Sequence, residues 1–215
     1  MSHSQPIRFK SKKNEVLLCN GIVEKHHALP EAAAFEANML KSLRAKGLAV
    51  PRVFSIENNL IKMEYIEGLT LPDLIDDLEN KGHSIGDVEK IAEAVITWLS
   101  EFFIAIDTRR TGKGRGDING RNFIFDGEKI WGIDFEEESL NRLPSPAEKT
   151  EFDVVEKDIA RLMAFVLNYD PPNTHLKIEL SNSILSFAEA ILSVNAETVL
   201  RRCQQETDAL LSRRK

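Results

Sequence analysis

The chain has 215 residues and a net charge of −6, with 42% hydrophobic and 29% charged residues. These values are typical of a globular protein of one domain or two small lobes, and they disfavour a generic nucleic-acid binder. There is no apolar run of about 18 residues and the first residues are polar, so we expect neither a transmembrane helix nor a secretory signal, and a cytoplasmic location. The two cysteines, Cys19 and Cys203, are too few for a disulfide framework or a zinc site.

The first third of the chain is predicted to form an antiparallel sheet. Short apolar segments alternate with turn signals, and Asn20-Gly21 is a strong two-residue hairpin turn. Val23 and Lys25 occupy alternate positions of one strand, so both side chains should lie on the same face of the sheet. The expected strands cover residues 7–10, 15–19, 22–26, 51–56 and 60–65.

A helix over residues 31–45 is predicted to interrupt this sheet, with Pro30 near its first turn. Apolar residues recur along it at helical spacing, and Glu36 borders the apolar stripe, where it can lean toward the sheet. Without further motifs, Lys25 and Glu36 would be interpreted as surface residues.

The rest of the chain is predicted to be mainly helical. Thr70 is placed to cap a short helix that Gly82 ends, and Pro171-Pro172 separate two later helices. The longest segment carries the apolar stripe of a core helix. The expected helices cover residues 73–81, 86–106, 151–168, 173–192 and 196–212.

A basic, glycine-rich loop is expected after the longest helix. Its basic side chains could neutralise phosphate or hold an anionic substrate, and a flexible solvated loop explains them equally well. The basic residues in or near this loop are Arg109, Arg110, Lys113, Arg115 and Arg121.

Three polar residues, Asp117, Asn122 and Asp134, stand around a second predicted hairpin, whose turn is Asp126-Gly127. A hairpin brings its two ends together, so Asn122 and Asp134 should lie side by side. An amide oxygen beside a carboxylate suits Mg²⁺ that carries substrate phosphates, and Asp117 is placed to orient a hydroxyl for attack. Each acid taken alone is more often a cap or turn residue.

The segments 116–122 (GDINGRN) and 133–136 (IDFE) together resemble the kinase-like phosphotransferases, most closely the aminoglycoside phosphotransferase and choline kinase-like branch. The resemblance covers about residues 15–165. It implies an α+β, two-lobed protein-kinase-like fold with a small antiparallel N-lobe at residues 1–66 and a mainly helical C-lobe at residues 67–215. The active site would lie in the cleft between the lobes.

The same resemblance implies roles for five residues. Lys25 would contact the phosphates of ATP, and Glu36 would hold Lys25. Asp117 would be the catalytic base or the group that orients the acceptor hydroxyl. Asn122 and Asp134 would bind Mg²⁺.

Further positions follow from the resemblance. Glu31 is the alternative partner of Lys25, and Asp158 would brace the catalytic loop. The segment MEYIEG resembles the hinge between lobes, where the backbone of Glu64 and Ile66 would pair with the adenine edge.

The sequence departs from the family pattern in three places. The turn over residues 11–14 replaces a glycine-rich phosphate loop, and Lys12 or Lys13 there could partly compensate. Arg115 stands where relatives have His before Gly-Asp. Only about 80 residues follow Asp134, a size similar to small kinases such as the RIO-like group and the kinase of the tRNA-modifying KEOPS complex.

These observations predict an ATP- and Mg²⁺-dependent phosphotransferase that acts on a hydroxyl of a small molecule. The alternatives are a protein-directed kinase or ATPase subunit that works with a protein partner, and a nucleotide-binding pseudokinase. The acceptor stays open, because the acidic run 136–138 favours a cationic substrate and the arginine cluster favours an anionic one. No membrane partner is expected, and the oligomeric state is equally open.

Overall fold

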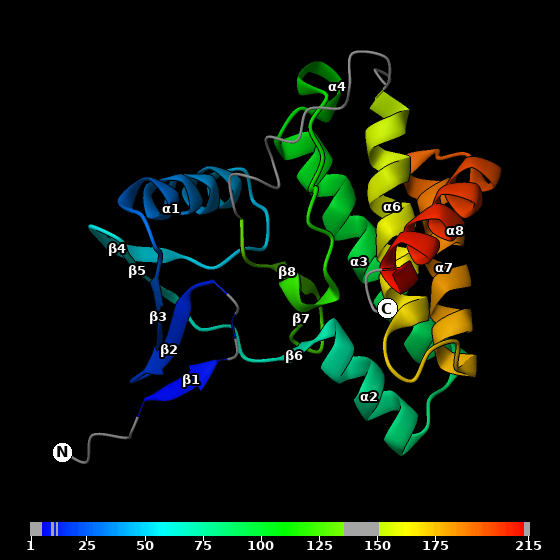
Figure 1. The fold of residues 1–215 in the computed structure, drawn as a ribbon, viewed down its shortest axis with the longest axis horizontal. Helices are drawn as coiled ribbons and strands as arrows, with labels where there is room; N and C mark the ends of the chain where they lie inside the picture. The colour runs from blue at the N-terminus through cyan, green and yellow to red at the C-terminus, as the bar shows by residue number, and fades with distance from the viewer. Residues whose placement is uncertain (1–5, 10, 12, 136–150, 213–215) are drawn as a thin grey trace.

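The computed structural model describes residues 6–9, 11, 13–135 and 151–212 (Figure 1). A five-stranded antiparallel sheet with one helix lies on one side of the molecule, and a group of helices with a smaller sheet lies on the other. The predicted α+β fold is confirmed. The elements of the first part are β1 (Ile7–Phe9), β2 (Glu15–Cys19), β3 (Ile22–His26), α1 (Pro30–Ala45), β4 (Val53–Glu57) and β5 (Leu60–Glu64).

The five-stranded sheet has the order β1-β2-β3-β5-β4, and every neighbouring pair is antiparallel. Asn20 and Asn58 close two of its hairpins with a positive backbone φ, a conformation that Asn tolerates better than most residues. Lys25 pairs with Val16 on one neighbouring strand and with Ile61 on the other, so it lies on a central strand. Helix α1 packs against β4 and β5.

Residues 65–68 connect this sheet to the helical part of the chain. The next strand, β6 (Leu69–Thr70), pairs with β7 (Phe123–Phe125), which in turn pairs with β8 (Ile130–Gly132). The predicted hairpin is therefore two strands of a three-stranded sheet. The sequence does not predict β6, because two residues carry no detectable alternation. The division into lobes at residue 66 stays a prediction.

Side-chain caps decide where three helices begin. Thr70, Ser84 and Thr174 each accept a hydrogen bond from the backbone N–H three residues later. Two helices consequently start earlier than predicted and one starts later, and a short helix replaces part of the predicted basic loop. None of the helices in the described part of the chain combines the length and the hydrophobicity that a membrane span requires. The helices are α2 (Leu71–Lys81), α3 (Ile85–Ala105), α4 (Thr108–Thr111), α6 (Glu151–Asn168), α7 (His175–Leu192) and α8 (Ala196–Ser212).

An aromatic core fixes the hairpin β7–β8 to helix α3. The ring of Trp98 stacks on Phe102 and meets Phe123 edge-on, with centroid distances of 5.5 and 5.4 Å. Phe135, just after the hairpin, stacks on Phe102 at 6.1 Å. Gly132 lies so close to the Trp98 indole that a methyl group at this position would overlap the ring. The residue that ends β8 therefore has to be glycine for a steric reason.

Gly132→Ala should lower the free energy of unfolding by about 1–3 kcal/mol, because the added methyl group displaces either the Trp98 ring or the β8 backbone. Urea or thermal unfolding measures this change. Gly86→Ala is a suitable control, since Gly86 is exposed and its added methyl group would make only an ordinary contact. That variant should be as stable as the wild type or slightly more stable. Equal stability of Gly132→Ala and the wild type would contradict the steric argument.

Candidate active site

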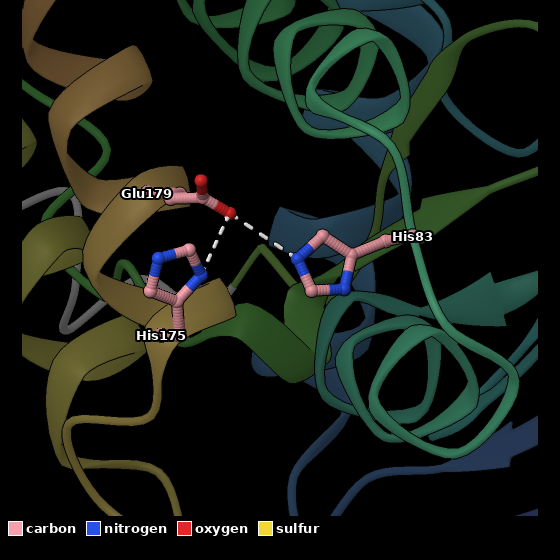
Figure 2. Close-up of side chains that lie close together, drawn as sticks. All are labelled: His83, His175 and Glu179. Atoms are coloured by element: carbon pink, nitrogen blue, oxygen red, sulfur yellow. Dashed lines mark hydrogen bonds and ion pairs between the residues drawn. The ribbon is translucent and has the colours of Figure 1, made fainter.

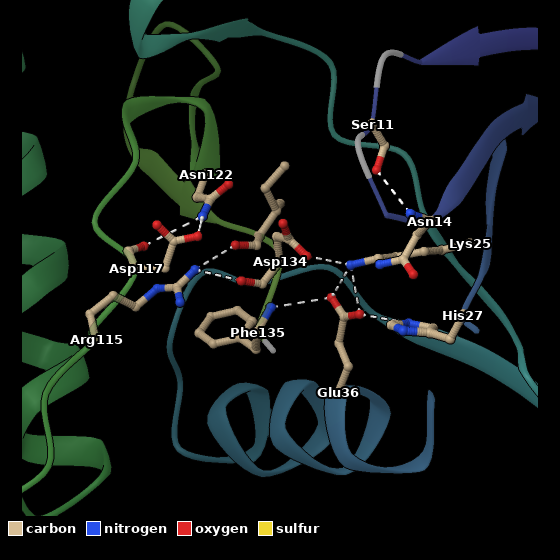
Figure 3. A network of polar contacts seen from close by, with 11 residues as sticks. Ser11, Asn14, Lys25, His27, Glu36, Arg115, Asp117, Asn122, Asp134 and Phe135 are labelled. Atoms are coloured by element: carbon tan, nitrogen blue, oxygen red, sulfur yellow. Dashed lines mark hydrogen bonds and ion pairs between the residues drawn. The ribbon is translucent and has the colours of Figure 1, made fainter. Parts of the chain in front are cut away.

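A buried lysine–glutamate pair lies where the first sheet meets helix α1 (Figure 3). The Nζ atom of Lys25, on β3, lies 2.9 Å from Oε1 and 2.7 Å from Oε2 of Glu36, on α1. Lys25 is 6% exposed and Glu36 is 1% exposed. The sequence places Glu36 at the border of the apolar stripe, whereas the structure buries it; Glu31, the alternative partner, is exposed. The structure therefore joins Lys25 to Glu36.

Two further groups hold Glu36. The Nε2 atom of His27 lies 2.8 Å from its Oε2 atom, and the backbone N–H of Phe135 donates to its Oε1 atom at 3.3 Å. Sequence analysis missed His27. A signal for it exists, because Lys25 and His27 stand two positions apart and the alternation of a strand puts them on the same face.

The environment keeps this pair charged at neutral pH. Burial alone would raise the pKa of Glu36, but the charge of Lys25 and the hydrogen bonds from His27 and Lys25 outweigh it and lower that pKa to about 2. Burial also disfavours the charge on Lys25, yet the carboxylates of Glu36 and Asp134 raise the pKa of Lys25 above its ordinary value. Each partner thus stabilises the ionised form of the other.

Asp134 joins the pair from the end of hairpin β7–β8. Its Oδ1 atom lies 2.5 Å from Nζ of Lys25. Its backbone has a φ of 62°, a conformation that costs energy in a non-glycine residue and that recurs at functional positions. At the other strand end, the carbonyl oxygen of Asn122 accepts the N–H of Ile133 at 2.9 Å. The hairpin therefore brings Asn122 and Asp134 to the same end, as predicted (Figure 3).

Asp117 lies beside Asn122, just before the short 3-10 helix η1 (Gly120–Asn122). The Nδ2 atom of Asn122 donates to the backbone oxygen of Asp117 at 3.4 Å and to its Oδ2 atom at 3.5 Å. Asp117 is exposed, whereas Asn122 is only 6% exposed. Because the amide nitrogen faces Asp117, the amide oxygen of Asn122 is left for another partner.

The donor atoms of Asp134 and Asn122 fit Mg²⁺. This ion prefers oxygen ligands, and proteins usually hold it through one or two carboxylates together with substrate phosphates. Asp134 supplies a carboxylate that is partly accessible, and Asn122 supplies an amide oxygen. The chemistry of the two side chains therefore agrees with the predicted metal-binding set, and their binding of metal stays a prediction.

Arg115 requires a correction, because it cannot hold phosphate or an anionic substrate. Its side chain is fully buried. Its Nη2 atom donates to the carbonyl oxygens of Ile133 and Asp134 at 2.7 and 2.8 Å, and its guanidinium lies 4.3 Å from the ring centroid of Phe135. Arg115 thus holds the backbone around Asp134 in place. This role requires long-range contacts, which sequence spacing does not reveal.

Asp158, on helix α6, supports the loop that carries Arg115. Its carboxylate accepts the backbone N–H of Arg115 at 2.6 Å and that of Gly116 at 3.4 Å. The predicted bracing position is confirmed by these two bonds. Burial raises the pKa of Asp158 to about 6, although the two backbone N–H groups and Arg161 favour its charged form.

The remaining predicted nucleotide-binding residues are Glu64, Ile66, Lys12 and Lys13. Glu64 ends β5, and its carboxylate accepts a hydrogen bond from Arg44 at 3.0 Å. Ile66 is buried in the segment between the two sheets. Lys13 is exposed between β1 and β2, and Lys12 lies outside the described residues. Nucleotide contacts of these four residues stay predictions.

The fold and the arrangement of these polar groups define a protein of the kinase-like superfamily, in which a strand lysine pairs with a helix glutamate. The comparison with protein families agrees, since the RIO domain family (RIO1) matches residues 8–176. The chain belongs to the RIO domain family.

The other comparisons add only a likeness of the fold. No curated protein matches the chain. The solved structure of WaaP in complex with acyl carrier protein is similar, with a TM-score of 0.56 and 16% sequence identity, over 98% of this chain and 87% of that chain. The more specific resemblance to the aminoglycoside phosphotransferase and choline kinase-like branch stays a prediction.

Glu36→Gln should lower the free energy of unfolding at pH 7 by about 3 kcal/mol, because the pKa of Glu36 falls from 4.5 to about 2 on folding. A carboxyl group with a lowered folded-state pKa stabilises the fold above its unfolded pKa and loses that effect as the pH falls. The wild type should therefore lose stability between about pH 4.5 and pH 2, and the variant should lose less.

Urea unfolding over this pH range tests the ion pair. Glu31→Gln is the matched control, since Glu31 lies on the same helix and is exposed. Its pH profile should follow that of the wild type. Parallel profiles for Glu36→Gln and the wild type would contradict the assigned pair.

Proposed function

We propose that this chain transfers the γ-phosphate of ATP to a hydroxyl group, with Mg²⁺ as the required ion. The proposal is carried by one observation, the convergence of Lys25, Glu36 and Asp134 from three separate segments of the chain. The hairpin end that presents Asp134 also presents Asn122, beside the exposed Asp117. If Lys25 were an ordinary surface residue and Asp134 an ordinary turn residue, no physical reason would bring their side chains together in a partly buried position.

Lys25 would bind phosphate oxygens of the nucleotide. Glu36 orients its ammonium group, and Glu36 is itself held by His27 and the N–H of Phe135. The Oδ1 atom of Asp134 already provides an anionic oxygen for Lys25, on a side chain that is 35% exposed. A phosphate oxygen would approach Lys25 from the side of this contact.

Asp134 and Asn122 would hold Mg²⁺, which neutralises phosphate charge when it is bound. Asp117 would accept the hydrogen of the acceptor hydroxyl and orient its oxygen for attack. The amide nitrogen of Asn122 lies 3.5 Å from the Asp117 carboxylate, and Arg115 restrains the backbone of Asp134. The chain would therefore act mainly by positioning its groups, as phosphoryl transfer requires.

For the acceptor we propose a small molecule, in line with the resemblance of the sequence to the aminoglycoside phosphotransferase and choline kinase-like branch. A protein acceptor or partner is the second candidate. It is favoured by the RIO domain match and by the likeness of the fold to WaaP, which was solved in complex with acyl carrier protein. The cytoplasmic location expected from the sequence belongs to the same proposal.

ATP with Mg²⁺ should raise the unfolding temperature of the wild type, because a ligand of the folded state stabilises it by about 2.7 kcal/mol at a hundredfold excess over Kd. Asp134→Asn should lose the Mg²⁺-dependent part of this rise, since the amide carries no charge for the ion. Thermal unfolding with ATP alone and with ATP plus Mg²⁺ separates the two contributions. Asp208→Asn, at an exposed position on α8, should behave as the wild type. Equal Mg²⁺ effects in Asp134→Asn and the wild type would contradict the metal assignment.

Asp117→Asn should lower phosphoryl transfer by roughly 10²- to 10⁴-fold, because it removes the group that accepts the proton. The thermal shift with Mg²⁺ and ATP should stay as in the wild type, since Asp117 is not assigned to nucleotide binding. ADP formation with a panel of small hydroxyl compounds, and labelled ATP with cell extract, measure transfer to the two acceptor classes. An unchanged rate would remove Asp117 from the mechanism. Nucleotide binding without any ADP formation would favour a binding module instead.

A further inference from the structure

A second group of polar side chains lies on the helical part of the molecule, on elements other than those that carry the candidate active site. His175 and Glu179 stand on the first turns of α7, and His83 stands on the loop between α2 and α3 (Figure 2). Their ligand atoms all lie within 4.8 Å of one another. Among the described residues, this is the one place where three His, Cys, Asp or Glu side chains come so close together.

Two of the three distances between ligand atoms match the coordination shell of a transition metal, and the third is within 4.8 Å. The Nε2 atom of His83 lies 3.2 Å from Oε2 of Glu179, and the Nδ1 atom of His175 lies 3.3 Å from the same oxygen. In a tetrahedral site with bonds of roughly 2.0–2.1 Å, neighbouring ligand atoms are about 3.3 Å apart. Both contacts of Glu179 therefore already have the spacing of such a site, and a rotation of the exposed His175 side chain can bring its nitrogen to the same ion.

The backbone holds both sides of the cluster in place. His175 and Glu179 are four residues apart on α7, so they lie on the same face of the helix. His83 stands between Gly82, with a φ of 84°, and Ser84, which forms a reciprocal cap with Asp87 at the start of α3. Helices α3 and α7 pack against each other. The three ligands thus come from elements with fixed relative positions.

Exposure and charge also favour a cation. His175 has a side chain that is 83% exposed, so an ion can enter from the solvent. Asp87 interacts electrostatically with His83 and adds negative charge nearby. Lys177, on α7, is held by Glu79 and by the carbonyl oxygen of Pro171, so its ammonium group is directed elsewhere.

We propose that His83, His175 and Glu179 bind one divalent transition-metal ion, with Zn²⁺ as the best match to two imidazoles and one carboxylate. Zinc sites with three protein ligands keep a fourth position for water or another ligand. The ion cross-links the α2–α3 loop to the start of α7. This site is independent of the nucleotide site and of the proposed phosphotransfer.

Isothermal titration of the metal-free full chain with Zn²⁺ tests this inference. The wild type should bind one ion, and His83→Ala, His175→Ala and Glu179→Gln should each bind at least about tenfold more weakly, since even groups outside the first coordination shell contribute roughly 10- to 100-fold to metal affinity. His175→Ala is the safest variant for folding because this side chain is highly exposed. Visible absorption of a Co²⁺ complex reports whether the ion is four-coordinate.

Three controls separate this site from other binding. His26→Ala removes a histidine on β3, and Glu189→Gln removes an exposed carboxylate on the same helix α7; both should bind Zn²⁺ as the wild type does. Asp134→Asn should also retain the Zn²⁺ site, so failure of the proposed phosphotransfer leaves this test intact. No Zn²⁺ binding by the wild type would overturn the inference, as would three variants that bind as tightly as the wild type. In either case the cluster would be a set of histidine–glutamate ion pairs.

Discussion

The architecture depends on how the buried positive charge of Lys25 is neutralised. The ammonium group of Lys25 lies in a position almost closed to solvent, and an isolated charge there would cost several kcal/mol. Glu36 and Asp134 compensate this cost, and they come from helix α1 and from the segment after β8. The contacts that neutralise Lys25 therefore also connect the first sheet, its helix and the hairpin. The same contacts therefore stabilise the charge of Lys25 and hold these elements together.

A second set of contacts holds the backbone of Asp134 in place. The positive φ of this residue is unfavourable, and the guanidinium of Arg115 holds the carbonyl groups of Ile133 and Asp134. Asp158 in turn holds the N–H of Arg115. A continuous chain of hydrogen bonds thus runs from Asp158 on helix α6 through Arg115 to Asp134, which contacts Lys25. Such restraint suits a site whose chemistry depends on positioned charges, because water and flexible side chains would otherwise have to reorganise.

Much of the fold follows from local sequence signals. Alternating apolar residues and the turns Asn20-Gly21 and Asp126-Gly127 predict most of the strands, and helical periodicity predicts the long helices, because both signals act within a few residues. The strand β6 and the helix α4 are too short for such signals. The convergence of Asn122 and Asp134 also follows from the sequence, because hairpin closure limits where these side chains can lie. The pairing of Lys25 with Glu36 was expected only from the resemblance to the kinase-like family.

The sequence by itself determined the order of the elements and, through its resemblance to a known family, the membership of the polar residues in one kinase-like pattern. The structure decided that Glu36 and not Glu31 pairs with Lys25. Only the tertiary structure decided how deeply Glu36 and Arg115 are buried and that His27 contacts Glu36. It alone brings His83 to the start of α7. The physical reason is that burial and long-range partners depend on how separate elements pack, and the spacing of residues along a chain carries no direct record of that packing.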